Sequence, residues 1–122
     1  MTDRRRHRGP HPQDADLFDD RHIPALREAV ADLSWLYSRG YAEPSAVKLV
    51  GDRRRLTERQ RLAVRRGACS DEQLETRRQK RAAWGDLRGC DLDIDGFNVL
   101  TTVESALSGG VVLCGRDGAW RG

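Results

Sequence analysis

The stretch HIPALREAVADLSWLYSRGY, residues 22–41, indicates the fold class because one apolar stripe runs along it. Leu26, Val30, Leu33 and Tyr37 recur at spacings of four, three and four residues, the period of an amphipathic helix. A proline suits its first turn and a glycine suits its end. We therefore predict a helix whose apolar stripe forms the core of a small helical domain.

Three further helices are predicted after this one. Their sequences are EPSAVKLVG (residues 43–51), LTERQRLAVRRGACS (56–70) and SDEQLETRRQKRAAW (70–84). The last two each carry the Ser/Thr-x-x-Gln spacing of a capping box, and a glycine closes the first. Because residues 70–84 offer few apolar side chains, we expect that helix to be a poorly packed connector. Together these segments define a helical domain over residues 21–84.

Composition limits the rest of the chain. With 122 residues, of which 38% are hydrophobic and 34% charged, it forms one small domain or part of a larger one. Residues 1–20 carry few apolar side chains, so we predict a disordered tail. We expect neither a secretory signal nor a membrane span. Three cysteines without a CxxC pair indicate reduced thiols and hence a cytoplasmic protein.

The charge of the chain is divided between two parts. Residues 48–81 hold twelve Lys or Arg against five Asp or Glu, a net charge of +7, whereas residues 82–122 carry a net charge of −3. Such a basic segment favours contact with the phosphates of RNA or another nucleic acid. Solvated arginines whose stems cover apolar surface explain the pattern equally well. The candidate nucleic-acid-binding side chains are Arg53, Arg54, Arg55, Arg59, Arg61, Arg65 and Arg66.

The final third of the chain changes character. CDLDIDG, residues 90–96, alternates apolar and polar side chains as a strand does. FNVLTTVESALSGG (97–110) follows with a helical pattern that ends in two glycines, and VVLCG (111–115) reads as a second strand before an Asp-Gly turn. The order predicts a β-α-β segment of an α/β domain over residues 85–122.

A calcium loop is the first alternative for the acidic part of this segment. Asp91, Asp93, Asp95 and the glycine that follows match the opening of an EF-hand loop. The twelfth loop position is Thr102, which cannot supply the bidentate carboxylate, and no predicted helix leads into the loop. We therefore do not expect calcium here.

The strand prediction gives two of these acidic residues another role. Asp95 would stand at the carboxyl end of the strand, where α/β proteins bind ligands, with Asp93 on the same face. Carboxylates placed there can hold Mg²⁺ or Mn²⁺ for attack on phosphate, and Asn98 could orient Asp95. The simpler alternative is a turn at Asp95 with Asn98 capping the helix.

Two resemblances extend this interpretation. IDGFNVL, residues 94–100, resembles the first-strand motif of PIN-like and NYN-type ribonucleases, which implies that Asp95 is a metal ligand and that Asn98 supports the catalytic site. RHIPALREAVADLSWLYSRGY, KLVGDRRRLTERQRLAVRR and IDGFNVLTTVESALSGG together resemble the prokaryotic family called domain of unknown function 434. That resemblance implies an N-terminal helical domain joined to a PIN-like C-terminal region.

The sequence therefore predicts an α-rich chain: a small helical domain followed by the start of a PIN-like α/β domain. A PIN-like site needs carboxylates from several strands, so we expect this segment to be truncated and inactive alone, with metal-dependent ribonuclease activity in full-length relatives. Two alternatives stay open, a non-catalytic nucleic-acid-binding helical module and a structural or interaction fragment.

Overall fold

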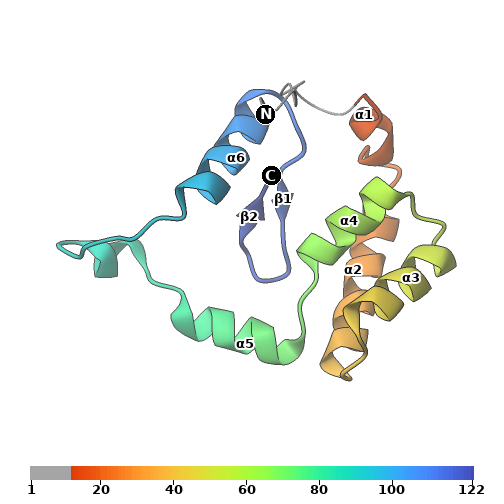
Figure 1. The fold of residues 1–122 in the computed structure, drawn as a ribbon, viewed down its shortest axis with the longest axis horizontal. Coiled ribbons are helices and arrows are strands. Elements are labelled where there is room, and N and C mark those ends of the chain that lie inside the picture. The colour runs from red at the N-terminus through yellow and green to blue at the C-terminus, as the bar shows by residue number, and fades with distance from the viewer. Residues whose placement is uncertain (1–11) are drawn as a thin grey trace, which may run out of the picture.

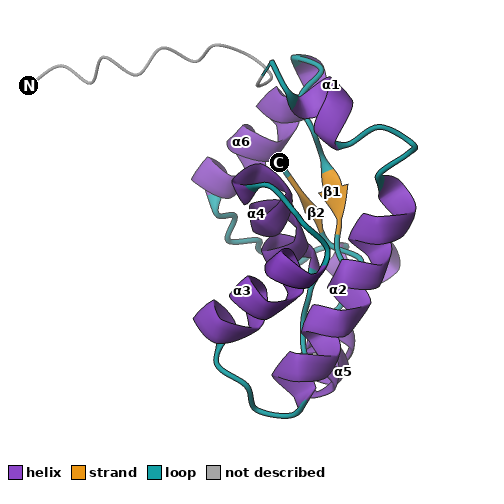
Figure 2. Cartoon of the chain, turned by 90° about the vertical axis from the view of Figure 1, so that its right-hand side faces the viewer, coloured by secondary structure: helices purple, strands orange, loops and turns teal. Residues whose placement is uncertain are grey.

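The computed structural model describes residues 12–122, and most of its regular elements are helices (Figures 1 and 2). Five α-helices come first: α1 (Asp14–Leu17), α2 (Ile23–Ser38), α3 (Glu43–Arg53), α4 (Glu58–Gly67) and α5 (Asp71–Lys80). A short 3₁₀ turn (Trp84–Leu87), α6 (Gly96–Leu107) and the strands β1 (Leu113–Cys114) and β2 (Trp120–Arg121) follow. The helix-rich part of the predicted fold class is therefore confirmed.

The predicted apolar stripe forms the core, as the sequence indicates. Leu26 and Leu33 of α2 are buried, and Val30 and Tyr37 are half-buried and pack against the same cluster. The other buried side chains of this cluster are Ala29 of α2, Ala46 and Val50 of α3, Leu56 in the turn that follows, and Val64 of α4. The core thus lies where α2 meets α3 and α4, and burial of the α2 stripe against them supplies the main driving force for folding.

Two capping boxes set the starts of α4 and α5. Thr57 Oγ1 accepts from the Gln60 backbone N–H at 3.3 Å, and Gln60 Oε1 accepts from the Thr57 N–H at 3.0 Å. Ser70 and Gln73 repeat this exchange at 3.1 Å in both directions. Both predicted boxes are confirmed because they depend only on local geometry. Helix α5 buries no residue, as expected of a connector.

Two predictions about the helical part were wrong. Gly51 does not end α3, which continues to Arg53, because the glycine lies in the helix interior beneath a long side chain from α4. The predicted disordered tail is not disordered from residue 12 onward, since α1 is helical and Phe18 packs against the core. The other part of that prediction, residues 1–11, lies outside the described residues.

The predicted strand at residues 90–96 is also wrong. Residues 91–95 have no regular structure, and α6 begins at Gly96. A strand needs a neighbour for its backbone groups, and within residues 12–122 the only sheet is the antiparallel pair of β1 and β2. The second predicted strand exists only as Leu113–Cys114, in a hairpin rather than in a β-α-β segment.

The hairpin joins the C-terminal third to the helical bundle. Figure 1 shows it between α6 and the bundle of α2, α3 and α4. The Arg116 backbone N–H donates to the Gly67 carbonyl at 2.8 Å, and Arg116 Nη1 donates to the Cys69 carbonyl at 2.8 Å. These bonds hold the hairpin against the end of α4. In the part of the chain that the structure describes, every helix is too short or too polar to cross a bilayer.

Candidate functional site

The acidic residues singled out by the sequence lie at the start of α6. Asp95 is the N-cap of this helix: its Oδ1 accepts from the Asn98 backbone N–H at 3.4 Å, and its Oδ2 accepts from Asn98 Nδ2 at 2.6 Å. A carboxylate suits this position because the first backbone N–H groups of a helix lack partners. The predicted pairing of Asp95 with Asn98 is therefore present, through a capping interaction with Asp95 as the cap.

The residues at this helix start do not form a complete metal site. Asp93 lies on an exposed irregular segment. The alternation of side chains along a strand, which was expected to place Asp93 on the same face as Asp95, is therefore absent. Among the described residues no three His, Cys, Asp or Glu side chains come together in a way that could hold a metal ion. Both Asp95 oxygens already accept from Asn98, so a divalent cation would need ligands from elsewhere.

Four of the predicted nucleic-acid-binding arginines form ion pairs within the protein: Arg54, Arg59, Arg61 and Arg65. Arg54 donates from Nη1 to Glu28 at 2.6 Å, and its Nε donates to Asp32 at 2.9 Å, so it ties the end of α3 to α2. Arg59 binds the buried Asp14 carboxylate through two bonds of 2.9 and 3.2 Å. These intramolecular contacts account for Arg54 and Arg59 without a nucleic-acid ligand.

Arg61 has a structural role of the same kind. Its Nε donates to the Leu56 carbonyl at 2.9 Å, and its Nη2 lies 3.0 Å from Asp52. The guanidinium group reaches these acceptors by lying across Gly51, where a Cβ would come within 2.5 Å of Nε. The missing side chain of Gly51 is therefore what lets Arg61 close the turn between α3 and α4.

The remaining four predicted arginines have different surroundings. Arg53 and Arg55 are exposed, and neither makes an ion pair with another residue of the described part. Arg65 lies 3.6 Å from Glu43, and Arg66 donates to the Gly122 carbonyl at 3.0 Å. Of the seven, Arg65 and Arg66 line the cavity between α5, the end of α4 and β2, so the tertiary structure divides the cluster that the sequence shows as one run.

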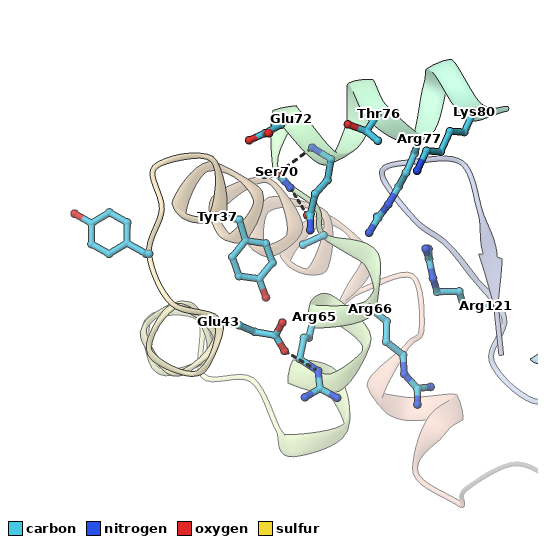
Figure 3. A pocket seen from close by; sticks show the side chains of 13 residues that line it. Tyr37, Glu43, Arg65, Arg66, Ser70, Glu72, Thr76, Arg77, Lys80 and Arg121 are labelled. Atoms are coloured by element: carbon cyan, nitrogen blue, oxygen red, sulfur yellow. Dashed lines mark hydrogen bonds and ion pairs between the residues drawn. The ribbon is translucent and has the colours of Figure 1, made fainter.

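That cavity is basic and lies between α5, the end of α4 and β2 (Figure 3). Its volume is about 790 Å³. Five of its lining side chains are cationic and two are acidic; the cations are Arg65, Arg66, Arg77, Lys80 and Arg121 and the acids are Glu43 and Glu72. The excess of positive charge in a concave site favours an anionic ligand.

One wall of the cavity is fixed by a buried carboxylate behind it. Asp117, in the hairpin turn, accepts from Arg77 at 3.0 Å and from Arg121 at 2.9 and 3.1 Å. The hydrogen bonds from Arg121 hold the pKa of Asp117 well below its usual range, against the opposing effect of burial. This ion pair orients two guanidinium groups that come from segments far apart in the sequence.

A tyrosine at the cavity lacks a polar partner. The Tyr37 hydroxyl oxygen is buried and has no hydrogen-bond partner among residues 12–122. Burial, with a smaller contribution from Glu43, raises the pKa of Tyr37 to about 12, although Arg65 opposes the shift. The hydroxyl therefore stays protonated and is an available donor. In Figure 3 it points toward the space between Glu43 and Arg65.

Sequence reasoning missed four residues of this cavity. Arg77 and Lys80 are in the last turns of α5, in the basic run RRQKR, which signals charge but not the direction of each side chain. Arg121 reaches the cavity only because the hairpin folds back on α4, and no local sequence pattern predicts that contact. Tyr37 was assigned to the apolar stripe alone, although it packs against the core and also lines the cavity.

Comparison with known proteins covers both parts of the chain. Residues 25–80 match the family described as "Protein of unknown function (DUF434)", and residues 84–122 match "Domain of unknown function (DUF5616)". These two matches support the resemblance of the chain to an uncharacterised family. The chain is also similar to "Uncharacterized protein MJ0935" of Methanocaldococcus jannaschii, with 32% identity over 91 residues. That match covers 74% of this chain but only 44% of the archaeal relative. No solved structure matches the chain.

Proposed function

We propose that this protein binds the phosphate backbone of a nucleic acid, most simply single-stranded RNA, in the basic cavity. The observation that carries the proposal is the convergence of cationic side chains from α4, α5 and β2 on one concave site. Guanidinium and ammonium groups are the usual protein partners of phosphate oxygens. Such binding is sequence-independent and weakens as salt increases, because neutralised phosphates release their counterions.

Other side chains of the cavity suit the same ligand. The protonated Tyr37 hydroxyl is buried, and when a ligand displaces the side chains that cover it, it can donate to a phosphate oxygen without adding charge. Tyr41 also lines the cavity and is 59% exposed, so its ring is free for a base to stack against. Glu43 and Glu72 disfavour an anion in their immediate vicinity, which directs the phosphate toward β2 and the basic last turn of α5.

The test compares two double variants that remove equal charge. Fluorescence anisotropy with a labelled single-stranded RNA would be measured across a series of salt concentrations. We expect Arg66→Gln/Lys80→Gln to weaken binding and to flatten the slope of log affinity against log salt. The control, Arg53→Gln/Arg55→Gln, removes two exposed arginines outside the cavity and is expected to leave affinity nearly unchanged. Equal losses in both variants would indicate diffuse charge attraction and would reject the cavity.

A second candidate function concerns metal-dependent cleavage of RNA by the longer relatives. The contact of Asp95 with Asn98 at 2.6 Å supports it, because the resemblance to PIN-like nucleases assigns metal binding to Asp95 and support of the site to Asn98. We infer that Asp95 is one ligand for Mg²⁺ or Mn²⁺ and that Asp93 is a second candidate ligand. The described residues supply no complete ligand set, so further ligands would have to come from outside residues 12–122.

Calorimetric titration tests the metal assignment in this chain. We expect weak Mn²⁺ binding by the wild type and none by Asp95→Asn, in which the asparagine still caps α6. Asp91→Asn is the matched control because it removes an exposed carboxylate outside the cap. Identical heats for the wild type and Asp95→Asn would remove the metal role and leave Asp95 as a helix cap only.

A further inference from the structure

Helix α6 exposes nearly all of its apolar side chains. Phe97 is 87% exposed, Leu100 69% and Leu107 84%, and the two valines of the helix, Val99 and Val103, are also exposed. On a helical projection these five side chains fall on one side of α6, so they form a continuous apolar face. Leu92 and Ile94, in the segment before the helix, are exposed as well and enlarge the apolar surface.

The opposite, polar side of α6 faces the protein. Thr102 Oγ1 accepts from the Gly122 backbone N–H at 3.3 Å, and a Cβ on Gly122 would meet Ser105 Oγ at 2.7 Å. Thr102 and Ser105 are half-buried by this contact. A surface helix normally directs its apolar side to the core and its polar side to water. Helix α6 does the reverse, so within residues 12–122 Phe97, Leu100 and Leu107 stay largely open to solvent.

The extent of this surface indicates that it is covered in the functional protein. Soluble monomers rarely leave a contiguous apolar patch of this kind open to water, and such patches usually mark an interaction surface. The hairpin borders only the edge of this face at Val99 and Val103, and its hydrogen bond to α6 is on the polar side, from Gly122 to Thr102. A partner with an extended apolar surface is therefore required.

The size of the helix argues against a second copy of the chain as that partner. Helix α6 has 12 residues and is thus about 18 Å long. Two helices of this length, packed side by side, fall short of the roughly 1,000 Å² that a specific protein interface needs. The comparison with the archaeal relative points to a different partner. More than half of the residues of that relative lie outside the matched region, whereas only about a quarter of the residues of this chain do.

We propose that the apolar face of α6 is the docking surface for additional polypeptide of the same domain, which longer relatives carry and these 122 residues lack. The occupant is an apolar sheet face or helix layer that packs on Leu100, Val103 and Leu107. Its packing leaves the polar side of α6 on the hairpin, where Thr102 holds Gly122. This inference is independent of the basic cavity, because none of these residues lines that site.

Binding of the dye anilinonaphthalene sulfonate, which fluoresces on exposed apolar surface, tests the proposal. We expect the 122-residue chain to bind the dye as a monomer in analytical ultracentrifugation. Leu100→Gln/Leu107→Gln is expected to lose most of this fluorescence with no fall in melting temperature, because neither leucine belongs to the core. Thr101→Gln is the matched control on the polar side of the same helix. The intact archaeal relative is expected to bind almost no dye, since its own chain covers the face.

Three results would overturn the inference. A dimer that dissociates in Leu100→Gln/Leu107→Gln but not in Thr101→Gln would make a second copy the occupant. Equal dye fluorescence from the intact relative and from this chain would show that additional chain does not cover the face. Unchanged fluorescence in the double variant would place the exposed apolar surface elsewhere than on α6.

Discussion

Asp117 accepts a hydrogen bond from Arg77 at 3.0 Å although 40 residues separate them in the chain. The contact joins the hairpin turn to the last turns of α5, an element that buries no residue of its own. Arg121 binds the same carboxylate, whose side chain is only 5% exposed. The position of α5 therefore depends mainly on polar contacts: this ion pair, the bond between Arg116 and Asp71 at 2.6 Å, and the bond from the Asp71 N–H to Ser38 Oγ at 2.9 Å.

The first prediction concerns Asp117. Asp117→Asn should lower the free energy of unfolding by about 1–3 kcal/mol at pH 7, because it leaves two guanidinium groups without their acceptor. Urea unfolding measures this loss. Asp93→Asn, a change at an exposed carboxylate, is the control and should leave the free energy almost unchanged. Equal effects of the two substitutions would contradict the structural role of Asp117.

The pH dependence of that loss has a definite sign. The folded pKa of Asp117 is lowered relative to the unfolded chain, so its contribution to stability is present above the unfolded pKa and is lost as the pH falls below it. The difference in unfolding free energy between the wild type and Asp117→Asn should therefore be constant near neutral pH and should shrink below about pH 4. A difference that grows on acidification would show that the carboxylate is not held in its charged form.

The second prediction tests the core. Leu33 is fully buried on α2, so Leu33→Ala should lower the free energy of unfolding by about 2–5 kcal/mol through lost burial and a residual cavity. Leu49→Ala removes the same atoms from a side chain that is 59% exposed and should cost less than about 0.5 kcal/mol. Thermal and urea unfolding of both variants measure the difference. Similar stability of the two variants would mean that the α2 stripe is not the core.

The third prediction concerns the Tyr37 hydroxyl. Because this buried group has no partner, Tyr37→Phe should raise the free energy of unfolding by about 1 kcal/mol in the absence of ligand. If the hydroxyl donates to phosphate, the same variant should bind RNA more weakly with an unchanged salt slope, since no charge is removed. Anisotropy and urea unfolding separate the two effects. A less stable Tyr37→Phe protein would indicate that the hydroxyl has a partner after all.

The fourth prediction concerns the contact of Gly51 with Arg61. Gly51→Ala should gain about 1 kcal/mol of helix propensity, but the new Cβ displaces the Arg61 guanidinium from Leu56 and Asp52. We therefore expect little net change in the wild type and a clear gain in an Arg61→Ala background. A double-mutant cycle in urea measures this coupling. Additive effects would mean that Arg61 moves aside without loss.

The helical domain was predictable because its signals are local. A stripe at helical spacing and two capping boxes involve residues within a few positions of one another, so α2, α4 and α5 follow from the sequence. The pairing of Asp95 with Asn98 is of the same kind, since it spans three residues at a helix start. The four helices predicted for this part therefore all form, although α3 runs past Gly51 to Arg53, and α4 and α5 end earlier than predicted, at Gly67 and Lys80.

The C-terminal third was predicted less well, because strand formation is not a local property. Residues 90–96 alternate as a strand does, but a strand is stable only where another strand satisfies its backbone groups, and none of the described residues does so there. The carboxylate of Asp95 instead binds the start of α6. A pattern that suits a strand thus became an irregular segment and a helix cap.

The sequence by itself determined α2 to α5, the capped starts of α4 and α5, and the apolar stripe that makes the core, since each depends on the spacing of neighbouring residues. Only the tertiary structure decided which charges act together. It paired Arg54 and Arg59 with acids of distant segments, and it brought Arg121 to the cavity beside Arg77. The physical reason is that a long charged side chain binds whatever acceptor the folded backbone brings within about 3 Å. Charge in a sequence therefore predicts attraction but not its partner.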